Sequence, residues 1–219
     1  MKTLAASLAG MIVLAATPLS EGTTASGLKE ALRVATERAV ESTSKTNGFL
    51  DNPKIRTGLP GKLSSVASAL RGIGMGAHVD ELEVAMNHAA EKAAGEATPV
   101  FVDAITQMSF DDARGILSGG DTAATQYFQK TTSDPLRTRF SPIVADAMKD
   151  VGVNKLYEQL IGRYTSAVPF ASAPKLDLNS YVTDKTLSGL FTVVGEEEKK
   201  IRTNPTARAT DLLKQLFGS

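Results

Sequence analysis

Two adjacent glutamates and a following arginine are the residues whose types and spacing best suit chemistry in this sequence. Glu197, Glu198 and Arg202 lie in the stretch YVTDKTLSGLFTVVGEEEKKIRTNP, whose apolar residues recur with the period of a helix. Two carboxylates can act as general acid and general base when their surroundings differ. The group is therefore a candidate for a carboxylate-based hydrolase, and equally for ligand binding without catalysis.

The helical period places Glu198 on the buried side of this helix. It falls four residues after Val194 and three before Ile201, in a gap of an apolar stripe. An unpaired charge is costly to bury, so a buried Glu198 must pair with a cation, accept hydrogen bonds or take a proton. We expect it either to pair with Arg202, one turn on, or to open onto a cavity with Glu197 or another acid; simple exposure is the remaining alternative. The first arrangement is structural, and the second supports a ligand or catalytic role.

The two histidines, His78 and His88, flank an acidic stretch and at first suggest a metal-binding helix. They share one side of the helix with Glu81, but a rise of 1.5 Å per residue separates the histidines by about 15 Å along the axis. Zinc ligands must lie within about 2.0 to 2.3 Å of one ion. We therefore predict no metal site and no cofactor.

Motifs for nucleotide binding and nucleophilic catalysis are missing. Gly72, Gly74 and Gly76 come close to a dinucleotide-binding loop, but Ala77 stands where its third glycine belongs, and a predicted helix precedes them instead of a strand. The sequence has no G-x-S-x-G elbow and no cysteine. These absences favour a protein that is not an enzyme.

The segment 47–61, NGFLDNPKIRTGLPG, cannot form a continuous helix, because it contains two prolines, three glycines and an Asn-Gly pair. Its apolar residues make it unlike a flexible linker. We predict an ordered loop that packs Phe49, Leu50 and Ile55 onto helices. Ordered loops often carry sites, so Phe49 and Arg56 are candidate ligand-binding residues; the alternative is a loop that only covers the end of a helical bundle.

Helical periods separated by turn residues run through almost the whole sequence, without an alternating strand pattern. We predict an all-α fold, a single compact domain of about nine to ten helices over residues 23–219. The predicted helices are 26–46, 62–73, 78–97, 99–108, 110–117, 122–131, 135–151, 153–167, 180–203 and 205–217.

Capping residues mark several of the helix starts. Ser109, with Asp112 three residues on, resembles a capping box. Asp134 before Pro135 places an acceptor at the N-cap and proline at the first helical position, which predicts a new helix there. The Ala-, Ser- and Pro-rich stretch 166–179 is the candidate for an internal hinge that lets the last two helices pack as a separate arm.

The N-terminus has the three regions of a secretory signal peptide. A lysine precedes a continuous apolar run over residues 4–16, and a proline then leads into a small polar region. The run is shorter than the roughly 20 residues that span a bilayer as a helix. We expect cleavage after Gly22, which makes residues 1–22 the signal, or alternatively after Ala25. The mature protein would be periplasmic or secreted, with no stable membrane span.

Charge and cysteine content narrow the classes of partner. Lysine plus arginine and aspartate plus glutamate both number 24, so the chain lacks the positive charge that nucleic acid or an anionic membrane selects. Without cysteine it can form neither a disulfide nor a thiolate metal site. We predict no nucleic-acid partner.

Four stretches of the sequence together resemble one bacterial family. They are NGFLDNPKIRTGLPG, GMGAHVDELEVAMNHAAE, AATQYF and YVTDKTLSGLF through EEEKKIRTNP. With them the chain resembles, over essentially all of its length after the signal, the family catalogued as Domain of Unknown Function 4197. The resemblance implies an exported, mostly helical protein of about this length, and it implies no reaction, since the family has no assigned activity.

These patterns favour an exported helical protein that binds a small ligand or an envelope partner. The alternatives are the hydrolase that uses Glu197 and Glu198, and a purely structural or assembly protein. A pocket lined by convergent acids would favour the hydrolase, and an apolar groove the binding protein. A large exposed apolar patch would favour the assembly protein.

Overall fold

Helices make up most of the computed structural model, which describes residues 21–168 and 176–204. These residues form eight α-helices and two 3-10 helices, Gly61–Leu63 and Gly95–Ala97, and no strand, which confirms the predicted all-α fold. The α-helices are α1 (Glu21–Ser44), α2 (Ser64–Gly72), α3 (Gly76–Ala94), α4 (Thr98–Gln107), α5 (Phe110–Ser118), α6 (Ala123–Asp150), α7 (Val153–Ala167) and α8 (Leu178–Thr203).

α6 is one continuous helix where the sequence predicted two. Two prolines lie inside it, and the prediction that Pro135 starts a new helix is wrong. Phe128, Leu136 and Phe140 are fully buried on both sides of this proline, so packing outweighs the hydrogen bond that proline removes. The predicted count of nine to ten helices is correspondingly too high for the described residues, and the last predicted helix, 205–217, lies outside them.

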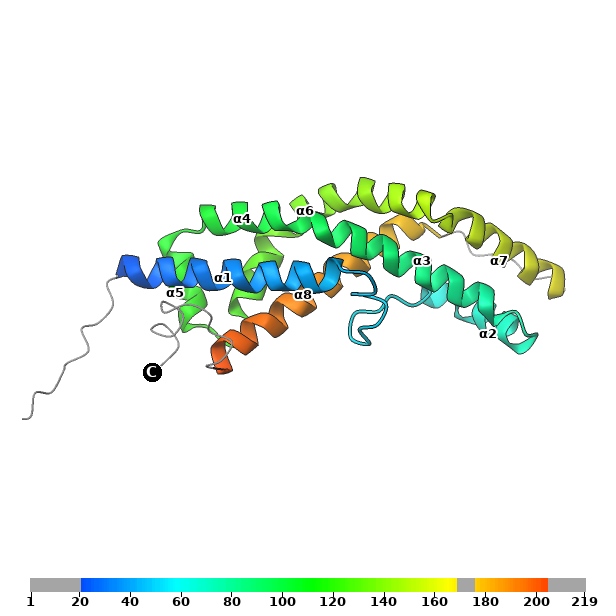
Figure 1. Cartoon of the computed structure of the whole chain (residues 1–219), viewed down its shortest axis with the longest axis horizontal. Coiled ribbons are helices and arrows are strands. Elements are labelled where there is room, and N and C mark those ends of the chain that lie inside the picture. Colours follow the sequence, from blue (N-terminus) through cyan, green and yellow to red (C-terminus); the bar gives the residue numbers. More distant parts are fainter. Residues whose placement is uncertain (1–20, 169–175, 205–219) are drawn as a thin grey trace, which may run out of the picture.

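α8 is central to the molecule. It packs against α1, α3 and α6, and Figure 1 shows it crossing an elongated bundle that has α1, α4 and α5 toward one end and α2 and α7 toward the other. α8 itself therefore packs within the bundle, and the second helix of the expected arm, 205–217, lies outside the described residues. Residues 169–175, at the centre of the predicted hinge 166–179, lie outside the described residues.

Three aromatic rings join α4, α6 and α8 in the core. The ring centroid of Phe101 lies 5.2 Å from that of Phe128 and 6.3 Å from that of Phe191, both in edge-to-face geometry. Such pairs contribute roughly 0.5 to 1.5 kcal/mol beyond the burial of their area. They fix the long helices against one another at the end of the bundle that holds α4 and α5.

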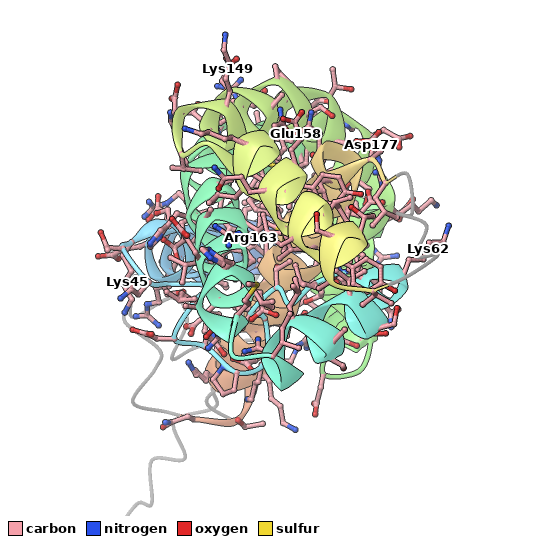
Figure 2. The ribbon with its side chains drawn as sticks, turned by 90° about the vertical axis from the view of Figure 1, so that its right-hand side faces the viewer. Lys45, Lys62, Lys149, Glu158, Arg163 and Asp177 are labelled. Atoms are coloured by element: carbon pink, nitrogen blue, oxygen red, sulfur yellow. The ribbon has the colours of Figure 1, made fainter. Side chains whose placement is uncertain are left out.

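Most of the charged side chains lie on the outer surface, with Glu91, Glu197 and Glu198 as buried exceptions. Figure 2 views the molecule from the end that α2 and α7 form, where Lys62 and Lys149 point away from the helices. In the part of the chain that the structure describes, no helix combines the length and the hydropathy that crossing a membrane requires.

Candidate functional site

The carboxylate of Glu198 lies at the N-terminus of α6 and is only 4% exposed. It accepts hydrogen bonds from the backbone N–H groups of Ala124 and Thr125, both at 2.9 Å, and from the Thr125 hydroxyl at 2.8 Å. The first N–H groups of an α-helix have no partner within the helix, and the N-cap residue Thr122 makes no side-chain cap. Glu198 therefore caps α6 from a different helix.

Arg202 completes this arrangement from one turn further along α8. Its Nε donates to Glu198 Oε1 at 3.0 Å, and one of its terminal nitrogens donates to the backbone carbonyl of Ile116 in α5 at 2.9 Å. A negative charge is favourable at a helix N-terminus, and a cation beside it offsets part of the free-energy cost of burying that charge. The two side chains thus join α5, α6 and α8.

Glu197 does not share an open space with Glu198. Lys200 donates to Glu197 at 2.6 Å. The hollow that Glu198 and Arg202 line against α1 has a volume of about 10 Å³, and Glu197 is not among the residues that line it. That volume holds about one water molecule. The two carboxylates consequently do not converge on a space that could hold a substrate.

The loop between α1 and α2 is held in place by Glu91 of α3. This carboxylate, 4% exposed, accepts hydrogen bonds from the backbone N–H groups of Asn47 and Phe49 at 3.1 Å and of Leu50 at 3.2 Å. Phe49 and Ile55 are buried and Leu50 is partly buried. The loop is ordered and packed, as the sequence predicted.

A second buried polar residue of α3 holds the far end of this loop. The side chain of Asn87 accepts from the Thr57 N–H and donates to the Thr57 carbonyl, both at 2.8 Å. Arg56, the next residue back, is exposed, and its guanidinium lies 3.6 Å from the Glu83 carboxylate. The structure thus fixes the backbone of the loop and leaves Arg56 at the surface.

Of the five candidate residues, the structure brings only Glu198 and Arg202 together. Phe49 is part of the core, and its ring packs on α8 at Gly189. Arg56 pairs with α3, and Glu197 pairs within α8. Of the hollows given for the described residues, only the one of about 10 Å³ is lined by any of the five, namely by Glu198 and Arg202.

Sequence reasoning missed Glu91 and Asn87, which position the loop. They stand four residues apart in the run AMNHAAEKAAGEA, which is otherwise rich in alanine. A polar pair on one helix face among small apolar residues indicates polar partners from another segment, because an unpaired buried polar group is costly. That signal was present, but it does not identify the partners.

The histidines belong to two separate contacts. His88 Nδ1 lies 2.8 Å from the same Glu91 carboxylate, and His78 Nδ1 lies 3.9 Å from Glu81. Among the residues that the structure describes, no three His, Asp or Glu side chains are placed to hold one metal ion. His88 is therefore a further partner of the carboxylate that orders the loop.

An apolar hollow lies between the first turn of α1 and one face of α5, and we call it the α1/α5 hollow. Its volume is about 380 Å³. Phe110 in its wall is 40% exposed, although it is a large apolar side chain. The guanidinium carbon of Arg114 lies 5.1 Å from the centroid of the Phe110 ring. The described residues that line it are Thr24, Ala25, Phe110, Ala113, Arg114, Leu117 and Ser118.

A neighbouring hollow of about 470 Å³ lies between α5 and the start of α6, and its lining includes Asp111 and Asp112. Asp112 forms the predicted capping box with Ser109, which confirms that prediction. Hydrogen bonds from the side chain and then the backbone of Ser109 lower the pKa of Asp112 below its usual range. A carboxyl that is harder to protonate is a poor general acid, so this aspartate serves to cap α5.

Comparison with known proteins identifies the family. A family model described as "Protein of unknown function (DUF4197)" matches residues 18–218. The chain belongs to this DUF4197 family. No curated protein and no solved structure matches it. Family membership thus supplies no reaction, ligand or partner for this protein.

Proposed function

We propose that this DUF4197 protein is an exported binding protein without catalytic activity, and that the α1/α5 hollow binds an apolar ligand. The observation that carries the proposal is the exposed ring of Phe110 in a concave, largely apolar wall with Ala113 and Leu117. Ligand sites are typically concave and apolar, with a few polar groups, and have volumes of roughly 300 to 1,000 Å³. The α1/α5 hollow has these properties.

The arrangement of the acids supports binding over hydrolysis. In a carboxylate-based hydrolase using Glu197 and Glu198, both groups must reach a substrate. Glu198 is instead directed at the N–H groups of α6, and Glu197 is engaged by Lys200. We therefore favour the binding protein over this alternative.

A purely structural or assembly role is the other alternative. It would be favoured by one large exposed apolar patch. In the described part of the chain the exposed large apolar residues, Ile73, Val102, Phe110 and Val151, belong to four different segments. Only Phe110 among them lines one of the hollows given above. This distribution supports one binding hollow over an extended assembly surface.

A neutral fluorescent probe, N-phenyl-1-naphthylamine, tests the proposal on the full mature protein. We expect its fluorescence to rise on binding to the wild type and the rise to be lost in Phe110→Asp, because a charge on the wall opposes entry of an apolar guest. Val102→Asp in α4 is the matched control, since Val102 is 39% exposed and Phe110 40%. The control should bind the probe as the wild type does.

Two results would overturn the proposed site. One is a wild type that does not bind the probe, and the other is an equal loss of binding in both variants. Native mass spectrometry of protein purified from the cell envelope supplies an independent readout, because a retained guest should be present in the Val102→Asp protein and absent from Phe110→Asp.

Export is part of the proposal and has its own test. The signal pattern of residues 1–22, which lie almost wholly outside the described residues, supports it. The buried apolar core begins at Leu28, so either cut would keep it. Cleavage after Gly22 would also keep Thr24 and Ala25, which line the α1/α5 hollow, whereas cleavage after Ala25 would remove them. N-terminal sequencing should find a mature protein that begins at Thr23 or at Ser26. A chain that retains Met1 and stays in the cytosol would refute export.

A further inference from the structure

We propose that the hollow between α5 and the start of α6, which we call the α5/α6 hollow, binds a small zwitterion of the amino-acid and short-peptide class. The amino group of the ligand meets Asp111 and its carboxylate meets Lys130. The site is separate from the α1/α5 hollow, and neither proposal depends on the other. Three features carry it, namely two charges of opposite sign, the two helices that hold them apart, and a floor that a glycine opens.

The charges of the hollow leave two side chains available to a ligand. Asp111 and Lys130 both line the hollow and are exposed, and within the described part of the chain neither side chain makes a hydrogen bond or a salt bridge. Asp112, the third charged residue in the lining, is occupied by Ser109 in the capping box. Two opposite charges that line one hollow without pairing are complementary to a ligand that carries both signs.

Two helices hold these charges apart. Asp111 lies eight residues before the turn 119–122 that joins α5 to α6, and Lys130 lies eight residues after it. α5 and α6 contact each other, and both residues line the hollow between them. The positive charge of Lys130 also contributes to the lowered pKa of Asp112, after the larger effect of the Ser109 hydrogen bonds, which places Lys130 near the start of α5. One small molecule can therefore reach both charges.

Gly115 opens the floor of the hollow. It lies inside α5, where glycine is less favourable than every other residue except proline. Nothing lies within 4 Å of a Cβ built at this position, and its backbone is helical. Neither close packing nor a left-handed backbone therefore requires this glycine. A side chain at position 115 would instead extend into the hollow.

The rest of the lining offers polar and apolar contacts between the two charges. Gln126 makes one long hydrogen bond, 3.4 Å from Nε2 to the hydroxyl of Thr122, and its amide has further donor and acceptor positions for a peptide group. The hydroxyl of Tyr127 donates to the Ala104 carbonyl at 3.2 Å, which fixes its partly buried ring in the wall. Ala123 is likewise partly buried. Small methyl side chains on a ligand suit these neighbours.

NMR titration of the full mature protein with dialanine tests the proposal. We expect the amide signals of Gly115 and Gln126 to shift as the dipeptide binds. N-acetyl-dialanine lacks the amino charge and dialanine amide lacks the carboxylate, so each should bind about fivefold more weakly, the upper end of what an exposed charge pair contributes. Raising the salt concentration should narrow both differences, because exposed charges are screened. Alanine and trialanine, titrated in the same way, identify the length of zwitterion that binds best.

Two charge variants assign the ends of the ligand. In Asp111→Asn, dialanine should lose its advantage over N-acetyl-dialanine and keep its advantage over dialanine amide. In Lys130→Met the reverse should hold. Asp103→Asn and Lys149→Met are the matched controls, because both residues are exposed on helices and neither lines the hollow. The controls should keep both preferences.

A third variant tests the floor. Gly115→Leu should fill the hollow and abolish binding of dialanine. Gly162→Leu in α7 is its control, since the Cβ of Gly162 would also have open space around it and this glycine lines a different hollow. It should bind dialanine as the wild type does.

Three results would overturn the proposal. They are a wild type that binds none of the three zwitterions, blocked dipeptides that bind as well as dialanine, and a Gly115→Leu protein that binds like the wild type. Binding of N-phenyl-1-naphthylamine reports on the α1/α5 hollow separately. Failure of the zwitterion site therefore leaves the apolar binding function standing, and the converse also holds.

Discussion

The ring of Phe49 lies against Gly189 of α8 in space that a side chain at 189 would need. A Cβ at this glycine would lie 2.5 Å from Cε1 of the ring and 3.2 Å from Cβ of Ile55. Phe49 is fully buried, so its ring has no open space to turn into. The close approach of the loop to α8 therefore depends on the absence of a side chain at position 189.

Gly189→Ala should lower the free energy of unfolding by about 1 to 3 kcal/mol, because overpacking a filled core forces neighbouring groups to shift. The expected loss outweighs the gain of up to about 1 kcal/mol that alanine ordinarily brings to a helix interior. Urea unfolding measures the change. Gly162→Ala in α7 is the control, since nothing lies within 4 Å of its new Cβ, and it should stabilise the protein. Equal stability of both variants would contradict this account of the contact.

Glu198→Gln should destabilise the protein by about 2 to 4 kcal/mol, because the amide retains the shape but loses the charge opposite Arg202 and turns an N–H group toward donors. Thermal unfolding checks the value. Glu196→Gln is the matched control, as Glu196 forms a partly exposed pair with Lys54, and pairs of that kind contribute roughly 0 to 1 kcal/mol. An unchanged melting temperature for Glu198→Gln would show that the carboxylate does not hold the helices together.

Asp112→Asn should weaken the cap of α5 at neutral pH by about 0.5 to 1 kcal/mol. The pKa of Asp112 is lowered in the folded state, chiefly by the hydrogen bond from the Ser109 side chain, so the stabilisation is present above the unfolded pKa and is lost as pH falls through the folded pKa. The difference in unfolding free energy between wild type and variant should therefore shrink as pH falls from about 5 toward 2. A difference that stays constant over this range would contradict the assignment.

Glu91→Gln should loosen the loop between α1 and α2 before it unfolds the protein. One of its two oxygens becomes an NH2 group that cannot accept, which leaves at least one loop N–H without a partner. Amide hydrogen exchange at Asn47, Phe49 and Leu50 should become at least about tenfold faster, as the loss of one buried hydrogen bond of roughly 1 to 3 kcal/mol implies. Glu96→Gln, on an exposed side chain, should not change exchange there. Unaltered protection in Glu91→Gln would refute the role of this carboxylate.

The helical period was sufficient to place Glu198 in the core, because the spacing of side chains on a helix follows from backbone geometry alone. It could not identify Ala124 and Thr125 as partners, since these donors come from a segment about 74 residues away. Pro135 shows the converse. Local chemistry predicted a helix start, and the burial of neighbouring residues on both sides of the proline overrode it.

The α1/α5 hollow could not be predicted from local sequence patterns either. Phe110 reads as an ordinary residue of a helical period, and its exposure follows from the way α1 meets α5. The loop was predictable in outline, since its prolines and glycines exclude a helix and its apolar residues require burial. Glu91 and Asn87, which hold the loop, bond to backbone groups. Every residue carries such groups, so the sequence does not show which of them are the partners.

Because α6 depends on Glu198 of α8 for its cap, the fold cannot close until α8 has been synthesised. α8 supplies both the cap of α6 and the surface at Gly189 on which the Phe49 ring packs, and it is the last helix that the structure describes. A chain synthesised only as far as α7 lacks both, so we expect it to remain open and sensitive to protease. If the proposed export uses a route that takes unfolded chains, the chain must cross before it closes. Closing contacts that await α8 would then keep it transportable until α8 has been synthesised.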